Sequence, residues 1–404
     1  MTNRSAAILI IKTLRKHGFQ SLLAGGCVRD MLLRVRASDY DVATNAAPAE
    51  VLRVFRRTIK VGARFGVVIV RIENQQVEVA TFRMDVNYTD GRRPDQVKFT
   101  TAREDALRRD FTVNGMFYDP VKREVIDYVN GRADLKERVI RTIGSAQERF
   151  SEDYLRMLRA VRFSARLDFA IDPETLASIK ENAHKISAIS RERITMELQG
   201  ILTNEYRVQG VNLLIKTTLA EYIFPGLDIE QFKGCLNILA GFKKKADFIL
   251  VLAGLFACCE TSAALNQIRT LKLSRNQLKK CTFLLTNRGI LLTDMSIADL
   301  KLMAYEQFFE DLYELQRVIQ RAKGDSIAQL TNLRKRLRDL GDIDLHPDPL
   351  IDGHALMDLG VPAGPLVGRL AQQMYKAQLE GVLTSVGDAR DWVKNKLSEV
   401  IKEF

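Results

Sequence analysis

Hydrophobic and polar positions along the chain follow two different patterns, which meet near residue 146. Before that point, short runs of β-branched and other apolar residues alternate with segments of helical periodicity. Beyond it, apolar residues recur at helical spacing, as in 154–167, 176–186 and 194–202, and strand patterns almost disappear. The sequence therefore predicts an α+β fold, in which a mixed head precedes an all-helical remainder.

The head is predicted to alternate helices with strands. Helices are expected at 8–14, 28–33 and 50–57, and strands at 21–24, 40–43, 66–72 and 77–82, the last two as a hairpin. The polar stretch 84–101 contains Gly91 and Pro94 and is predicted to be a loop. A second polar stretch, 341–350, contains two prolines and is expected to set off a last helical segment.

Two glycines and two carboxylates mark the first candidate site. Gly25 and Gly26 follow the predicted strand 21–24, and Asp39 and Asp41 belong to the next strand region. Because alternate residues of a strand project from one face, both carboxylates are expected to point at one spot. Mg²⁺ takes oxygen ligands, commonly one or two carboxylates together with substrate phosphates. Glycines lack a Cβ and let backbone N–H groups approach a triphosphate, so the pattern predicts a magnesium–nucleotide site.

Neighbouring residues strengthen this interpretation. Two aspartates at this spacing often lie at the solvated end of a strand, and alone they are a weak indication. Here Arg29 adds a cation near the expected phosphates, Asp30 an acid that can orient it, and Glu78 a third carboxylate from a later strand. Two metal ions can activate an attacking hydroxyl and stabilise a leaving pyrophosphate. We therefore expect Asp39, Asp41 and Glu78 to form the catalytic group, with Asp39 and Asp41 as metal ligands.

A second motif, Arg-Arg-Asp-Phe-Thr-Val-Asn, occupies 108–114. Arg108 and Arg109 carry planar guanidinium groups that can pair with phosphate oxygens. Asp110 and Asn114 are four positions apart, so on a helix they share a face and could bond a ribose hydroxyl. The alternative interpretation is the solvated, salt-bridged start of a helix.

The segment 152–163 is predicted to be a helix that recognises bases. Asp153 and Arg156, three positions apart, would face the same way, the first accepting from an exocyclic amino group and the second donating to the adjacent ring nitrogen. Cytosine and adenine satisfy both groups, whereas uracil and guanine present a carbonyl oxygen to the carboxylate. Arg159 and Arg162 continue the helix and are expected to contact the triphosphate or support the base readers. Without this context the pair would be taken for an ordinary ion pair.

Together these motifs resemble one family. The run 22–33, Leu-Leu-Ala-Gly-Gly-Cys-Val-Arg-Asp-Met-Leu-Leu, followed by Asp39-Tyr-Asp41, closely resembles the signature of the bacterial-type (class II) tRNA nucleotidyltransferase and poly(A) polymerase family. The motifs at 108–114 and 152–156 resemble its second motif and its nucleotide-recognition motif. The resemblance implies a DNA polymerase β-like nucleotidyltransferase head followed by an elongated all-helical neck, body and tail. The expected domains are a head at 1–145, a neck with the nucleotide-recognition helix at 146–204, a body at 205–340 and a tRNA-binding tail at 341–404.

The resemblance also draws attention to particular positions. The family usually has Gly where this chain has Arg34, which could alter the turn before the carboxylates, and Ala where it has Gly115. Arg193 and Glu197 resemble an element that braces the base-reading helix. The loop 90–95 resembles a mobile element that the family uses in switching from C to A addition.

Composition fits a polyanionic partner. Lys and Arg number 61 against 50 Asp and Glu, a net charge of +11, which suits nucleic acid or an anionic membrane surface. No apolar run approaches the ~18–20 residues that span a bilayer, and no secretory signal is recognised. The five cysteines include no C-x-x-C pair, so neither a disulfide framework nor a structural zinc site is indicated and a reducing cytoplasm is expected.

The expected function is the Mg²⁺-dependent, template-independent addition of C and A from CTP and ATP to the 3′ end of tRNA or another RNA. Pyrophosphate would be released, and the enzyme would be a monomer or homodimer without a membrane partner. Two alternatives share the head: a poly(A) polymerase, favoured by Phe117-Tyr118-Asp119, and an enzyme that adds only A or only CC. A catalytically idle RNA-binding protein is a further alternative, and retention of the acidic and basic motif residues argues against it.

Overall fold

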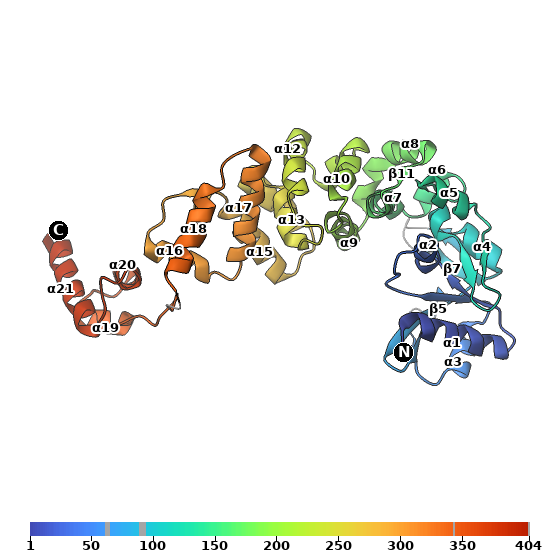
Figure 1. Ribbon diagram of the computed structural model, residues 1–404, viewed down its shortest axis with the longest axis horizontal. Helices are drawn as coiled ribbons and strands as arrows, with labels where there is room; N and C mark the ends of the chain where they lie inside the picture. The colour runs from blue at the N-terminus through green and yellow to red at the C-terminus, as the bar shows by residue number, and fades with distance from the viewer. Residues whose placement is uncertain (61–64, 89–93, 342–343, 403–404) are drawn as a thin grey trace. The chain divides into compact units, whose positions relative to one another are not determined.

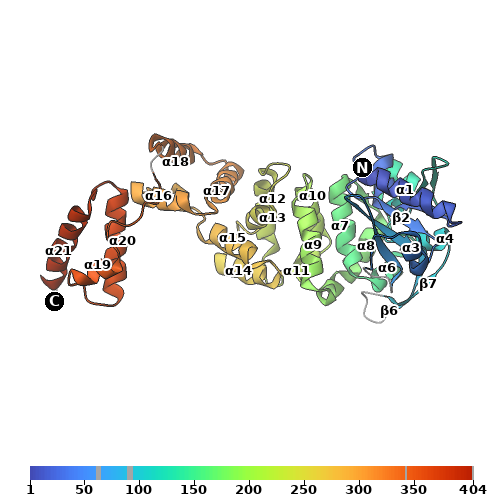
Figure 2. The same ribbon diagram turned by 90° about the horizontal axis from the view of Figure 1, so that it is seen from below.

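The computed structural model describes residues 1–60, 65–88, 94–341 and 344–402. The chain divides into two compact units, of which the first comprises Met1–Lys233, Lys243–Phe248 and Asn266–Leu273 and the second the remaining residues. The predicted order is confirmed, because a head built on a β-sheet comes first and helices follow it (Figures 1 and 2). Within the described residues every helix is too short or too polar to span a bilayer.

The head is organised by a seven-stranded mixed sheet in the order β3-β4-β5-β2-β1-β8-β9. Its strands are β1 (Ser21–Ala24), β2 (Asp41–Thr44), β3 (Thr58–Ile59), β4 (Val67–Ile72), β5 (Gln75–Thr81), β8 (Phe117–Asp119) and β9 (Glu124–Ile126). Strand β1 is buried along its whole length and pairs antiparallel with both β2 and β8, while β2, the central strand, runs parallel to β5. This pairing places the end of β1 beside the start of β2, and the start of β2 beside the middle of β5, where Asp41 and Glu78 are found.

Short helices flank the sheet. They are α1 (Asn3–Lys16), α2 (Gly26–Leu32), α3 (Pro48–Val54), α4 (Ala102–Leu107) and α5 (Gly131–Glu137). The apolar positions of α1 are spaced so that one stripe is buried, and this stripe packs against β1 and β5. Helix α4 begins with a capping box, in which Thr101 accepts from the backbone N–H of Glu104 and the Glu104 side chain accepts from that of Thr101.

The prediction of a loop over 84–101 is wrong. Residues Arg83–Tyr88 form β6 and Pro94–Phe99 form β7, which pair as a separate antiparallel hairpin. The strand pattern is present in the sequence, because Met84, Val86 and Tyr88 alternate with polar residues, but Gly91 and Pro94 favoured the prediction of a loop. Of the loop expected at 90–95, the first four positions lie outside the described residues and the last two begin β7.

A cluster of helices follows the head within the first unit. The elements are α6 (Ala146–Glu152), α7 (Leu155–Leu167), α8 (Pro173–Asn182), α9 (Arg191–Leu202), α10 (Arg207–Lys216) and α11 (Leu219–Ile223), with a two-stranded parallel sheet of β10 (Val139–Ile140) and β11 (Ala170–Ile171). Helix α7 packs against α9 and α10 through a continuous buried face. The single helix predicted at 152–163 is instead two helices, because the chain is extended at Asp153 (φ −155°, ψ 103°).

The rest of the chain is helical throughout its described part. Its helices are α12 (Ile229–Ala240), α13 (Phe248–Leu255), α14 (Thr261–Thr270), α15 (Arg275–Thr286), α16 (Ile297–Tyr305), α17 (Phe309–Lys323), α18 (Ala328–Asp339), α19 (Gly353–Asp358), α20 (Pro365–Leu379) and α21 (Val386–Lys402). The last three surround their own apolar cluster, which includes Leu356, Leu370, Met374 and Val393. In the same unit Lys301 Nζ on α16 donates to the carbonyl of Leu379 at the end of α20, at 2.7 Å.

Candidate nucleotide-binding site

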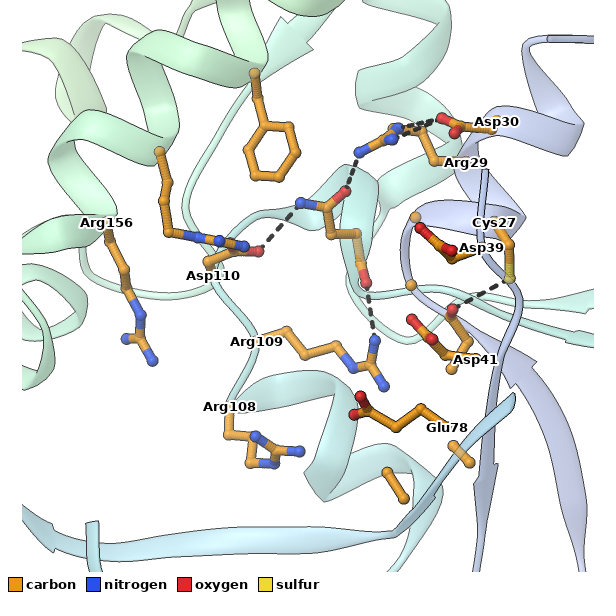
Figure 3. A pocket seen from close by; sticks show the side chains of 18 of the residues that line it. Cys27, Arg29, Asp30, Asp39, Asp41, Glu78, Arg108, Arg109, Asp110 and Arg156 are labelled. Carbon is orange, nitrogen blue, oxygen red and sulfur yellow. Dashed lines mark hydrogen bonds and ion pairs between the residues drawn. The ribbon is translucent and has the colours of Figure 1, made fainter. Parts of the chain in front are cut away.

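One cavity of about 540 Å³ in the first unit collects the residues that the sequence singled out (Figure 3). All fourteen line it, namely Gly25, Gly26, Arg29, Asp39, Asp41, Glu78, Arg108, Arg109, Asp110, Asn114, Asp153, Arg156, Arg159 and Arg162. They come from the head and from the first helices after it, so the fold brings together motifs that are far apart in the chain.

The glycine turn between β1 and α2 forms part of the cavity wall. Gly25 has φ 74° and ψ −134°, a conformation that L side chains rarely adopt. A Cβ built at this position would lie 3.0 Å from Arg109 Nη1, so the absence of a side chain also makes room for that guanidinium. The turn therefore depends on glycine for both its backbone conformation and its close approach to an arginine.

The three predicted carboxylates gather on one side of the cavity, and Arg156 lies on the opposite side (Figure 3). Asp41 is the first residue of β2 and Glu78 lies on the neighbouring strand β5. Asp39 precedes the strand, so the argument from alternating strand positions is wrong for it. Its carboxylate accepts from Ser38 Oγ at 3.0 Å.

The electrostatics of Asp41 favour a bound cation. Its side chain opens into the cavity but is enclosed by the cavity walls, and this burial, together with the negative charges of Glu78 and Asp39, raises its pKa from the usual 3.8 to about 6 against the opposing effect of Arg109. Among the described residues no group of three or more metal-ligating side chains is preassembled. Two carboxylates completed by substrate phosphates nevertheless form a suitable set for Mg²⁺.

Arg108 and Arg109 are both held by a residue that sequence reasoning missed, Asp105 on α4. Arg109 Nη2 lies 2.9 Å from one oxygen of this carboxylate and Arg108 Nη2 lies 2.7 Å from the other. Burial alone would raise the pKa of Asp105, but the charges of Arg109 and Arg108 outweigh it and the pKa lies below its usual value. Asp105 is therefore an ionised, buried anchor for two arginines of the cavity.

A chain of ion pairs and hydrogen bonds crosses the back of the cavity. Arg29 Nε donates to Asp30 Oδ1 at 2.8 Å, as expected, and Arg29 Nη1 donates to Asn114 Oδ1 at 2.7 Å. Asn114 Nδ2 donates to Asp110 Oδ1 at 3.2 Å, and Arg159 Nη2 donates to Asp110 Oδ2 at 2.7 Å. Asn114 ends a short 3₁₀ helix, Thr112–Asn114, so the four-residue α-helical spacing assumed from the sequence is wrong. In the structure Asp110 and Asn114 link arginines to one another.

The proposed base readers lie where α6 ends and α7 begins. Asp153 Oδ2 accepts from Arg193 Nη2 at 2.6 Å, and Asp153 Oδ1 accepts from the backbone N–H of Leu155 at 3.1 Å. Arg156 pairs with Glu152 and donates to the carbonyl of Arg149 at 2.9 Å. The prediction that Arg193 braces this region is confirmed. Asp153 and Arg156 do not pair with each other, and each is oriented by other partners.

Arginines of α2 and α7 surround one aromatic ring of α7. The guanidinium carbons of Arg29, Arg159 and Arg162 lie 5.3, 5.3 and 4.5 Å from the centre of the Phe163 ring. Arg162 also pairs with Glu197 at 2.7 Å, which confirms the second expected brace. Gly200 on α9 makes room for it, because a Cβ there would lie 2.6 Å from Arg162 Cδ.

A mixed sheet that presents a glycine turn and carboxylates to an arginine-lined cavity defines a nucleotidyltransferase head. A family profile described as "Poly A polymerase head domain" matches residues 21–141, and one described as "Probable RNA and SrmB- binding site of polymerase A" matches 168–230. The chain is 33% identical to the CCA-adding enzyme of Lactobacillus johnsonii over 94% of both chains. It is 32% identical to that of Streptococcus uberis, over 97% of this chain and 96% of the other. The chain therefore belongs to the family of CCA-adding enzymes.

A solved structure agrees with this assignment. The crystal structure of the CCA-adding enzyme of Bacillus stearothermophilus in complex with CTP is 29% identical to this chain and has a TM-score of 0.83, with all of both chains covered. The resemblance to bacterial-type tRNA nucleotidyltransferases that rests on the motifs at 22–41, 108–114 and 152–156 is thereby confirmed.

Proposed function

We propose that the chain adds C and A from CTP and ATP to the 3′ end of tRNA, without a nucleic-acid template and with release of pyrophosphate. The observation that carries this proposal is that one cavity is lined both by the carboxylates Asp39 and Asp41 and by the base readers Asp153 and Arg156. A site for phosphoryl chemistry and a site for base choice therefore share one bound nucleotide. The relatives named as CCA-adding enzymes support the choice of acceptor.

The proposed reaction is an in-line displacement. The 3′ hydroxyl oxygen of the RNA forms a bond to the α-phosphorus of the nucleotide, the bond between that phosphorus and the bridging oxygen breaks, and pyrophosphate leaves with the bonding electrons. The proton of the hydroxyl passes to solvent or to a cavity carboxylate. Arg108 and Arg109 would hold the triphosphate, and their charge would stabilise the departing pyrophosphate.

Magnesium is the proposed cofactor, and Asp39 and Asp41 are its proposed ligands, with Glu78 as a third carboxylate beside them. The raised pKa of Asp41, caused by enclosure and by its acidic neighbours, supports this assignment, because a cation would relieve the repulsion. When bound, Mg²⁺ would polarise the phosphate and make the hydroxyl easier to deprotonate.

Base choice is assigned to Asp153 and Arg156. Asp153 is fixed by Arg193 and by the N–H of Leu155, so it can accept from the amino group of cytosine or adenine without reorganising. Arg156 would donate to the neighbouring ring nitrogen. Uracil and guanine would place a carbonyl oxygen against the carboxylate and leave both acceptors unpaired, which is a strong form of discrimination.

We also propose the division of labour expected from the sequence. The head, 1–145, would carry out the chemistry, and the neck, 146–204, would recognise the nucleotide. The tail, 341–404, would bind tRNA, and the helical body, 205–340, would connect it to the neck. The separate apolar cluster of α19, α20 and α21 supports the tail as a distinct part.

One assay tests the function. Purified protein receives Mg²⁺ and single labelled nucleotides, with tRNAs that end before the CCA sequence, within it, or without only its last A. Addition of C, C and A followed by a stop is expected. Unlimited addition of A to unrelated RNA would instead identify a poly(A) polymerase, and addition of only A or only C would identify a partial enzyme.

A further inference from the structure

Asp105 occupies an unusual place beneath the nucleotide cavity. It lies on α4, is 2% exposed, and does not line the cavity itself. Its two oxygens serve two different arginines: Oδ2 accepts from Arg109 Nε at 3.2 Å and Nη2 at 2.9 Å, and Oδ1 accepts from Arg108 Nε at 3.0 Å and Nη2 at 2.7 Å. One buried carboxylate therefore accepts hydrogen bonds from the Nε and Nη2 atoms of two guanidinium groups that line the cavity.

Arg109 makes further contacts beside the glycine turn. Its Nη1 donates to the backbone carbonyl of Asn114 at 3.3 Å, and its guanidinium carbon lies 5.0 Å from the centre of the Phe117 ring. The same Nη1 would lie 3.0 Å from a Cβ at Gly25. The guanidinium is thus placed against the glycine turn. Its positive charge also acts on Asp41, where it opposes the rise in the pKa of that carboxyl group.

Arg108 connects the same carboxylate to the base of the β6–β7 hairpin. Its Nε donates to the backbone carbonyl of Arg83 at 2.7 Å, and the backbone N–H of Arg83 donates to Asp105 Oδ1 at 3.3 Å. Asp105 therefore accepts hydrogen bonds from three residues: Arg83 at the start of β6, Arg108 and Arg109.

Resting on the proposed function, we propose that Asp105 is a positioning residue that holds Arg108 and Arg109 in the geometry that binds the triphosphate of the incoming nucleotide. Two neighbouring guanidinium groups repel each other, and the buried carboxylate between them offsets that repulsion while leaving the pair with a net positive charge. Without the negative charge the two groups would separate, and each would lose the fixed fork that matches phosphate oxygens. The substrate chemistry concerned is the polyphosphate, so the effect is independent of the base.

The test measures polyphosphate binding without nucleotide addition. Calorimetry at constant Mg²⁺ gives the affinity of inorganic tripolyphosphate for the wild-type protein and for Asp105→Asn, a variant of equal size without the charge. The affinity is expected to fall about tenfold, as for the loss of one charge-assisted hydrogen bond. The KM values for CTP and ATP should rise by a similar factor, while the preference for CTP over UTP stays within about twofold.

Matched variants separate positioning from general damage. Asp119→Asn also removes a buried carboxylate paired with an arginine, here Arg15 at 2.9 Å, and Asp119 does not line the cavity, so its affinity for tripolyphosphate should equal that of the wild type. In a protein that already carries Arg108→Ala and Arg109→Ala, adding Asp105→Asn should change the affinity by less than about twofold, because it acts through those arginines.

Unchanged tripolyphosphate affinity in a folded Asp105→Asn protein would overturn the proposal, and so would a full further loss in the double-arginine background. Should Asp105→Asn not fold, Asp105→Glu carries the test: it keeps the charge but moves the carboxylate by one methylene, so a folded variant is expected to lose more than about threefold in affinity, and an affinity equal to that of the wild type would refute the role. A wild-type protein that binds tripolyphosphate but adds neither C nor A would refute the proposed function alone.

Discussion

Arg193 Nη2 on α9 lies 2.6 Å from Asp153 Oδ2, and this contact joins α9 to the junction between α6 and α7. Both groups are largely shielded from water, with side-chain exposures of 23% and 15%. Because the second oxygen of Asp153 is held by the backbone N–H of Leu155, the carboxylate has a fixed orientation toward the cavity. The accuracy of base choice should therefore depend on Arg193 as well as on Asp153, the proposed base reader.

Arg193→Met is expected to reduce selectivity before it reduces turnover. It removes one charge-assisted hydrogen bond, so the ratio of kcat/KM for CTP to that for UTP should fall about tenfold, equivalent to ~1.4 kcal/mol. Steady-state kinetics with each nucleotide would measure it. Arg138→Met is the control, since Arg138 pairs with Asp168 at the surface and does not line the cavity. An unaltered CTP-to-UTP ratio in Arg193→Met would refute the orienting role.

Asp41 should make the metal-free protein less stable as the pH rises. Its pKa in the folded chain, about 6, lies above the usual 3.8, so the folded state holds this proton more tightly than the unfolded state. That contribution to stability is fully present below about pH 4 and is lost as the pH rises through 6. In chelator at about pH 8, Asp41→Asn should therefore melt at a higher temperature than the wild type, and the difference should vanish toward about pH 4.

Added Mg²⁺ is expected to reverse this order. Binding to the folded state should raise the melting temperature of the wild type, whereas Asp41→Asn lacks one of the proposed ligands and should respond weakly. The same variant and Asp41→Ala are expected to abolish every nucleotide addition. Thermal melts at several pH values, with and without Mg²⁺, measure the effects of pH and of Mg²⁺ on the melting temperatures of the wild type and of Asp41→Asn. A melting temperature of Asp41→Asn below that of the wild type at about pH 8 in chelator would contradict the electrostatic argument.

The cavity residues could be predicted because their chemistry is local in the sequence. The glycine pair, the aspartates at 39 and 41, the motif at 108–114 and the pair at 153 and 156 each show their spacing directly, and all of them line one cavity. The partners that hold these residues could not be predicted in the same way. Asp105 follows directly after Glu104 on α4, and the sequence does not distinguish the two acids; the fold exposes Glu104 as a cap and buries Asp105.

One error in secondary structure has a similar origin. The chain breaks between α6 and α7 because Asp153 accepts a hydrogen bond from Leu155, a local side-chain bond that competes with the helical ladder. The spacing of apolar residues does not reveal such competition, because the apolar residues of 155–167 keep their helical spacing whether or not the helix is interrupted before them. The missed hairpin of β6 and β7 has a different origin: the alternation of Met84, Val86 and Tyr88 with polar residues is visible in the sequence, and the loop-forming Gly91 and Pro94 outweighed it in the prediction.

Gly115, where the family usually has Ala, is closely packed. Its φ of −88° is accessible to any residue, so glycine is not needed for the backbone. A Cβ would lie 2.7 Å from Val129 Cγ2 and 2.9 Å from Ile143 Cδ1. Gly115→Ala is therefore expected to lower the free energy of unfolding by about 1–3 kcal/mol, measured by urea denaturation.

A second substitution tests the packing explanation for Gly115. Val129→Ala removes the nearest methyl group, so adding it to Gly115→Ala should cost less than Val129→Ala costs in the wild type, a coupling of about 1 kcal/mol. Gly368→Ala is the control: it lies in α20 with no atom within 4 Å of its Cβ position, and alanine should not destabilise it. Additive effects of the two substitutions would rule out the steric explanation.

Arg34, the other departure from the family pattern, lies in the turn before the carboxylates, where its backbone conformation is strained. Its φ of 57° is in the left-handed region, which costs a non-glycine residue about 1–2 kcal/mol. Arg34→Gly removes that cost but makes the unfolded chain more flexible, by about 0.5–1 kcal/mol, so a net gain of about 0.5–1 kcal/mol in the free energy of unfolding is expected. Arg36→Gly, at an exposed position without a positive φ, should lose about 0.5–1 kcal/mol. Urea denaturation of both variants decides the matter: if Arg34→Gly loses as much stability as Arg36→Gly, the turn at Arg34 is not strained, and the arginine must stabilise it through its side chain.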